Sequence, residues 1–93
     1  MNNDFWIFKD GASQFPCASF PYAYRQMYHT MKTGVEKGRK YADMVKQMVI
    51  ISPQKDQHGE PRRYNYTSAT ELAKASDLLM TNGEINPKVF KHK

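Results

Sequence analysis

The order of apolar and polar residues along this 93-residue chain predicts a mixture of helices and strands. Phe5–Phe8 is a run of aromatic and β-branched residues that ends near an Asp-Gly pair, which is typical of a short strand buried on both faces and followed by a turn. The segment 12–19 contains a proline and shows no period, so we expect it to be a loop. From Phe20 to Val35 the apolar residues recur at helical spacing, which predicts an amphipathic helix that ends at Gly34.

A second helical stripe and a hairpin follow. The apolar residues between Tyr41 and Val49 again have helical spacing. A strand is expected to begin at about Val49, because Val49–Ile51 is a β-branched run. Arg62–Thr67 alternates between polar and aromatic residues, so this segment is the expected partner strand. The polar segment Gln54–Pro61 would be the loop of the hairpin.

The end of the chain predicts a third helix and a tail. Ser68 and Glu71 have the spacing of a capping box, and the apolar stripe that follows runs to Met80 before Asn82-Gly83. We expect residues 87–93 to be an extended or frayed tail. The whole chain is therefore expected to be a single small basic domain of the α+β class, residues 1–93. Its predicted order is β-α-α-β-β-α, with a short antiparallel sheet of about three strands packed against three helices.

Composition narrows the classes of partner. Fourteen Lys and Arg against nine Asp and Glu give a formal charge of +5, which suits nucleic acid or an acidic protein. The lone Cys17 excludes an internal disulfide and favours a reducing, cytoplasmic compartment. The N-terminus does not resemble a signal peptide, and no apolar run approaches the length of a membrane span, so no membrane partner is expected.

A glycine-punctuated basic stretch separates the first two predicted helices. Gly34-Val35 is followed by Gly38-Arg39-Lys40, and then by Ala42 and Val45. This order resembles the hairpin of the helix-hairpin-helix family, although Glu36 and Lys37 are inserted where that family has a tight hairpin. The resemblance implies that backbone amides grip a DNA phosphate without reading sequence. With the neighbouring cation included, the predicted nucleic-acid contacts here are Gly34, Lys37, Gly38, Arg39 and Lys40.

A plain helix-to-helix turn is the competing interpretation of the same stretch. Glycine supplies positive φ in any tight connection, and lysines keep a turn solvated. A second candidate lies in the strand expected at Arg62, Arg63 and Tyr64, where cations and interleaved rings suit single-stranded nucleic acid. Its competing interpretation is an ordinary half-buried strand, with Tyr64 and Tyr66 in the core and the arginines in water.

A protein interface is the alternative to nucleic acid. Tyr22 lies off the apolar stripe of the first predicted helix, so it is expected to be exposed, and Arg25 and His29 lie on the polar face of that helix. Aromatic and arginine side chains are enriched at protein interfaces. The chain could then be an adaptor, an inhibitor or a structural accessory protein, viral or oligomeric. A homodimer also remains open.

Signals for catalysis are thin. Cys17 and His29 could form a thiolate–imidazole pair. However, His29 is expected on the polar face of its helix, and a cysteine is usually a small buried apolar residue. Asp56, His58 and Glu60 alternate within one polar loop without a fourth ligand. We therefore predict no catalytic residue, no metal and no cofactor. The predicted function is a non-catalytic binding module, with nucleic acid as the first choice of partner and an acidic protein as the second.

Overall fold

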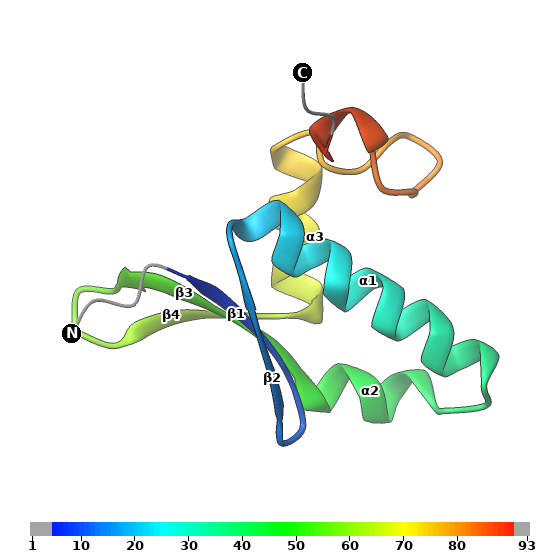
Figure 1. Cartoon of the computed structure of the whole chain (residues 1–93), viewed down its shortest axis with the longest axis horizontal. Coiled ribbons are helices and arrows are strands. Elements are labelled where there is room, and N and C mark those ends of the chain that lie inside the picture. Colours follow the sequence, from blue (N-terminus) through cyan, green and yellow to red (C-terminus); the bar gives the residue numbers. More distant parts are fainter. Residues whose placement is uncertain (1–4, 91–93) are drawn as a thin grey trace.

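The computed structural model describes residues 5–90, whose elements follow the order β-β-α-α-β-β-α (Figure 1). The elements are β1 (Trp6–Asp10), β2 (Ser13–Cys17), α1 (Phe20–Glu36), α2 (Tyr41–Gln47), β3 (Met48–Lys55), β4 (Pro61–Asn65), α3 (Tyr66–Ala75) and the short 3-10 helix η1 (Pro87–Phe90). The predicted α+β class, with an antiparallel sheet and three α-helices, is confirmed. The predicted count of about three strands is wrong, because the sheet has four strands in the order β2-β1-β3-β4.

The strand missing from the prediction is β2, which occupies the segment expected to be a loop. β1 and β2 form a hairpin whose turn contains Gly11, with a φ of +62° that suits glycine. Pro16 argues against a strand in the sequence because it cannot donate to a β-ladder. It is tolerated here because β2 is an edge strand, and it lies opposite Ile7 of β1.

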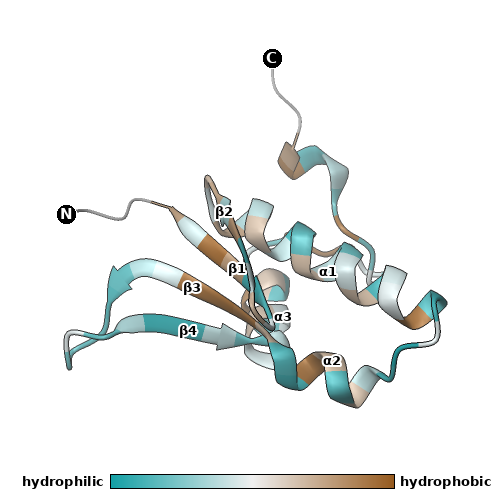
Figure 2. Ribbon diagram, turned by 60° about the horizontal axis from the view of Figure 1, so that its bottom comes forward, coloured by the Kyte–Doolittle hydropathy of each residue, from teal (hydrophilic) through white to brown (hydrophobic). Residues whose placement is uncertain are grey.

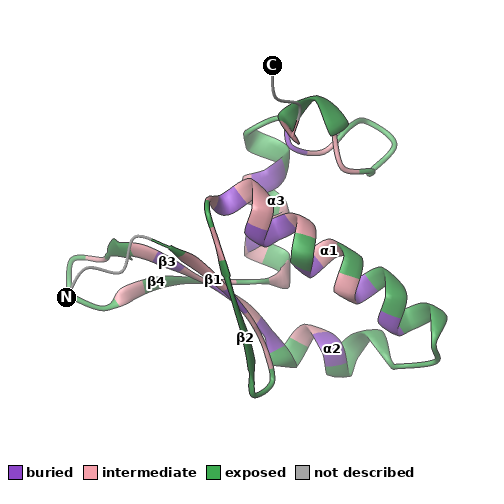
Figure 3. Ribbon diagram, viewed as in Figure 1, coloured by how far each residue is buried: buried purple, intermediate pink, exposed green. Residues whose placement is uncertain are grey.

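All three α-helices pack against the same face of the sheet. Phe8, Met48 and Ile50, from β1 and β3, are buried in the core that these helices form. Figure 2 shows the hydrophobic stretches of β1 and β3 and the helices beside the sheet. Figure 3 shows the buried positions along α1 and through the middle of the sheet. The core side chains supplied by the helices and by the segment after α3 are Phe20, Ala23, Tyr24, Met27, Met31, Met44, Ala69, Ala73 and Leu78.

Both ends of α3 differ from the prediction. The helix begins at Tyr66, because Asn65 caps it: the Ser68 N–H donates to Asn65 Oδ1 at 2.8 Å. The predicted capping box at Ser68 is therefore wrong, and Tyr66 belongs to the helix rather than to a strand. α3 ends at Ala75 instead of continuing toward Met80, and Asp77 has a φ of 60°. This turn places Leu78 in the core, where only 1% of its surface is exposed.

The C-terminal segment folds back onto α1. In place of the extended tail expected from residue 87, Pro87–Phe90 form a turn of 3-10 helix, and residues 91–93 of the expected tail lie outside the described residues. The ring of Phe90 meets that of Tyr22 edge to face, with centroids 5.1 Å apart. Within residues 5–90, no helix combines the length and the hydropathy needed to cross a lipid bilayer.

A cluster of tyrosines lies where the helices meet. The hydroxyls of Tyr24 and Thr70 are 3.1 Å apart, and the Thr70 hydroxyl donates to the Tyr66 carbonyl at 2.8 Å. The ring of Tyr41 meets that of Tyr66 edge to face at 5.9 Å. Burial, reinforced by the neighbouring Tyr24, raises the pKa of Tyr66 to about 12. The neutral phenol is therefore the form that this cluster stabilises.

Stability is predicted to fall at alkaline pH for this reason. An unfolded Tyr66 loses its proton near pH 10, whereas the folded one keeps it until the pKa of about 12. The contribution of Tyr66 to the free energy of unfolding is thus fully present below pH 10 and is lost as pH rises toward 12. The measurement is the urea midpoint, followed by circular dichroism, as pH is raised. Tyr66→Phe keeps the ring and should show a shallower fall, and a fall as steep as that of the wild type would contradict the assignment.

Candidate functional site

The basic stretch 34–40 that joins α1 to α2, which we call the elbow, forms a hydrogen-bonded cap at the C-terminus of α1. α1 continues two residues beyond the predicted stop at Gly34 and ends at Glu36. Gly38, with a φ of +95°, donates its N–H to the Val35 carbonyl at 3.0 Å, and the Arg39 N–H donates to the Gly34 carbonyl at 2.9 Å. This pair of bonds is a Schellman motif. Two of the amides that the helix-hairpin-helix resemblance would direct at a phosphate are therefore already bonded within the turn.

Gly34 has a packing role. It is buried, and a Cβ built on it would lie 2.6 Å from Met44 Sδ, which no real Cβ could tolerate without movement. Met44 is fully buried. The glycine therefore lets α1 and α2 approach closely, and its backbone borders a surface hollow that Lys37 and Arg39 also line.

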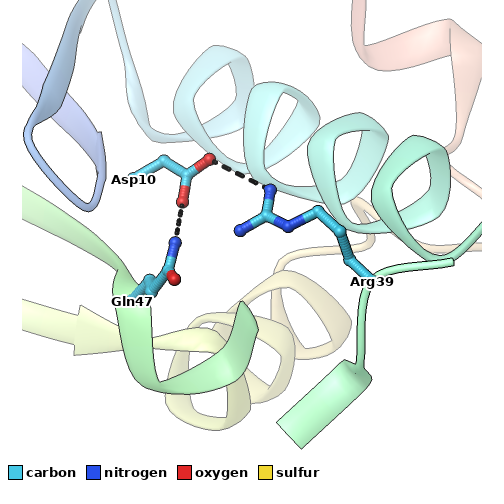
Figure 4. A network of polar contacts seen from close by, with 3 residues as sticks. All are labelled: Asp10, Arg39 and Gln47. Carbon is cyan, nitrogen blue, oxygen red and sulfur yellow. Dashed lines mark hydrogen bonds and ion pairs between the residues drawn. The ribbon is translucent and has the colours of Figure 1, made fainter. Parts of the chain in front are cut away.

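Arg39 is tied to the sheet. Its Nη1 lies 3.9 Å from Asp10 Oδ2, and the other carboxylate oxygen of Asp10 accepts a hydrogen bond from Gln47 Nε2 at 3.1 Å (Figure 4). The Arg39 side chain is 42% exposed and that of Asp10 only 17%, so the contact lies at the surface and stabilises the fold little. Lys37 and Lys40 are exposed on either side of it.

The predicted basic and aromatic strand divides between two faces of the sheet. Tyr64 is partly buried on the inner face, with its ring 6.2 Å from that of Trp6 and 6.1 Å from that of Phe20. Arg63 is exposed and lies opposite Ile51, one residue out of phase with Tyr64, and Arg62 is exposed as well. Tyr64 is therefore a core residue and does not form a stacking surface with Arg63.

The two predicted basic sites also lie apart. Figure 1 shows the α1–α2 connection at one end of the long axis and the β3–β4 hairpin toward the other. Lys37–Lys40 and Arg62 with Arg63 are thus separate patches rather than a single surface.

The predicted interface residues on α1 do lie together. Tyr22, expected to be exposed, is partly buried against Phe90. The Arg25 guanidinium lies over both rings, with its Cζ 5.1 Å from the Tyr22 centroid and 4.3 Å from that of Phe90. His29 is exposed, and its ring meets that of Tyr28 edge to face at 5.6 Å.

The structure reveals a further surface, which we call the outer sheet face. Register places Ile7 opposite Ile51 and Ile51 opposite Arg63, and it places Lys9 opposite Val49. These positions alternate with the core residues, so they point away from the helices. Within residues 5–90 no helix packs on this side. The outer sheet face consists of Ile7, Lys9, Gln14, Pro16, Val49, Ile51, Arg63 and Asn65.

The chemistry of the outer sheet face is aliphatic at the centre and cationic at the rim. Ile7, Val49 and Ile51 are partly exposed, and they lie between Lys9 and the exposed Arg63. The face includes no carboxylate. The prediction that Phe5–Phe8 is a strand buried on both faces is therefore wrong, because Phe5 is 54% exposed and Ile7 is partly exposed on the side that no described helix covers. The continuous apolar runs in β1 and β3 did indicate two apolar faces, and the described residues cover only one.

The candidates for catalysis and metal binding show no assembled site. Burial raises the pKa of the Cys17 thiol, which disfavours the reactive thiolate. Asp56 Oδ1 accepts hydrogen bonds from the backbone N–H groups of His58 and Glu60, an arrangement that closes the β3–β4 loop. Over the described range 5–90, no three His, Cys, Asp or Glu side chains gather as metal ligands would.

Comparisons of the chain with protein-family models, with curated proteins and with solved structures found no significant match. The function must therefore be argued from the surfaces described above.

Gly34→Ala tests the packing role of this glycine. In an ordinary helix this change stabilises by about 1 kcal/mol, but here the new methyl group meets Met44, and we expect a loss of roughly 1–3 kcal/mol. Urea denaturation measures the free energy of unfolding. Thr33→Ala, at the exposed neighbouring position, is the matched control and should be nearly neutral. Gly34→Ala should also weaken the effect of Met44→Ala in a double-mutant cycle, and a stabilised single variant would refute the close contact.

Proposed function

We propose that this protein is a non-catalytic binding module that holds an acidic protein partner on its outer sheet face. The observation that carries the proposal is the aliphatic centre of that face, Ile7, Val49 and Ile51, which no other described element covers. β-branched aliphatic side chains at the centre of an open sheet face are a contiguous apolar patch, and such patches mark interaction sites.

The side chains of this face favour protein over single-stranded nucleic acid. Sheets that bind single strands stack bases on aromatic rings, and the outer sheet face includes none. Aliphatic side chains pack instead against the apolar stripe of a partner helix or strand.

Charge selects the kind of protein. Lys9 and Arg63 flank the apolar centre without a carboxylate in the face, so an amphipathic segment with Asp or Glu beside its apolar stripe is complementary. A second copy of the chain packed face to face would bring the same cations together, which disfavours a homodimer through this face. An acidic amphipathic helix of another protein is therefore the proposed occupant.

Site-specific photo-crosslinking in the native host tests this proposal. A photoreactive amino acid at Ile51 reports on the outer sheet face, and the same amino acid at Gln26, an exposed position of α1, is the matched control. We expect one acidic protein to be captured from Ile51 and not from Gln26. Lys9→Glu with Arg63→Glu should reduce that capture at least about tenfold, since like charges oppose docking.

The alternatives give different products. Crosslinks from Ile51 to a second copy of the chain, to nucleic acid, or to proteins whose capture ignores the double charge reversal would each overturn the proposal. Circular dichroism of the variants separates loss of docking from loss of folding.

Nucleic-acid binding at the elbow is the second candidate. It is supported by the exposed cations Lys37, Arg39 and Lys40 in the short connection between α1 and α2, and by the net charge of +5. Side chains rather than amides would then contact the phosphates, because the Gly38 and Arg39 amides are bonded within the elbow.

This candidate predicts salt-sensitive binding. Fluorescence polarisation of labelled single- and double-stranded oligonucleotides should show affinity that falls steeply as salt rises. Arg39→Ala with Lys40→Ala should abolish it. Lys74→Ala with Lys88→Ala removes the same charge from exposed positions elsewhere and is the control. Absence of binding at low salt, or equal losses in both double variants, would exclude a specific site at the elbow.

A further inference from the structure

We propose that the hollow between α1 and the C-terminal segment binds a phosphate monoester that carries a planar apolar body. The hollow has a volume of about 310 Å³ and is bordered on one side by α1 and on the other by residues between Glu84 and Phe90. This volume is near the lower limit for small-molecule pockets and accommodates one ring with its phosphate.

The central observation is the state of Arg25. Its guanidinium lies over two aromatic rings that meet edge to face, with Cζ 5.1 Å from the Tyr22 centroid and 4.3 Å from the Phe90 centroid. The residue is half-buried, yet among residues 5–90 no carboxylate or other acceptor bonds to its N–H groups. The N–H groups of Arg25 can therefore donate two parallel hydrogen bonds to an oxyanion.

A histidine and a lysine of α1 line the same hollow. His29 and Lys32 follow Arg25 at intervals of four and three residues, so all three lie on one stripe of α1. The only acidic residue of α1 is Glu36, at its last position. Glu84 is the one carboxylate that borders the hollow within the described chain. A dianionic phosphate gains more than a carboxylate from such a set of donors.

The opposite wall accounts for the apolar body. Ile85, Pro87 and Phe90 line the hollow beside Tyr28 of α1. These side chains offer flat apolar surface within reach of Arg25 and Lys32. An anionic head on Arg25 and Lys32 would therefore place an attached ring against this wall.

The inference is independent of the proposed function. The hollow lies on α1 and the C-terminal segment, whereas the outer sheet face lies on the side of the sheet away from α1. If an experiment overturns the proposal for one of these two surfaces, the proposal for the other still stands.

Titration of the full-length, ¹⁵N-labelled protein with phenyl phosphate, inorganic phosphate, adenosine monophosphate and benzoate tests the site, at constant ionic strength. We expect saturable shifts of the Arg25 Nε–H signal and of the amides of His29 and Ile85. Phenyl phosphate should bind about tenfold more tightly than inorganic phosphate, because only it fills the apolar wall, and also more tightly than benzoate. A nucleotide that binds more tightly than phenyl phosphate would name the source of the phosphate, and the reverse order would indicate a phosphorylated aromatic.

Variants separate this site from general attraction to a basic protein. Arg25→Lys keeps the charge but loses the planar fork and should weaken phenyl phosphate binding about tenfold. Lys32→Gln, at an exposed position, should weaken it as well and keeps the test decisive if Arg25→Lys unfolds the C-terminal segment. Lys74→Gln, at an exposed position of α3 away from the hollow and from the elbow, is the charge-matched control and should bind like the wild type. Shifts that do not saturate, equal affinity for benzoate, or equal losses in Lys32→Gln and Lys74→Gln would overturn the proposal.

Discussion

Phe8 of β1 and Ile50 of β3 lie opposite each other at the centre of the sheet, both fully buried. Around this pair the chain gathers most of the large apolar side chains of its helices, since a chain of 93 residues has room for one core. The methionines Met27, Met44 and Met48 fill the irregular space between α1, α2 and the sheet. Because all three α-helices pack on the inner face of the sheet, none of the described helices covers the outer face.

The features that could be predicted from the sequence are those with strong local period. The stripe of α1, the start of β3 near Val49 and the hairpin to β4 follow from spacing and β-branched composition alone. β2 could not be predicted, because Pro16 is compatible with a strand only at the edge of a sheet, and the sequence does not show which strand lies at the edge. The boundaries of α3 moved for similar reasons. Asn65 competes with Ser68 for the cap, and the burial of Leu78 ends the helix early.

The candidate site shows the same limit. Exposure of Lys37 and Lys40 follows from composition, but only packing reveals that Gly34 serves Met44 and that Arg39 meets Asp10. Alternation alone allows Tyr64 to belong either to a stacking surface or to the core. The contacts of its ring with the rings of Trp6 and Phe20 place it in the core. Arg25 was recognisable as a polar-face residue, whereas its place over two rings depends on a segment more than sixty residues away.

Pro16 has a consequence for how this protein behaves when it is abundant. An antiparallel sheet with an apolar face is a template for fibrils whenever a free edge can recruit another strand. At β2 the recruitment fails at the proline, which has no N–H to offer an incoming chain, and at β4 the edge carries Arg62 and Arg63, whose charges repel a second copy. The sheet can therefore keep one apolar face uncovered by its described helices without a free edge that recruits further strands into filaments.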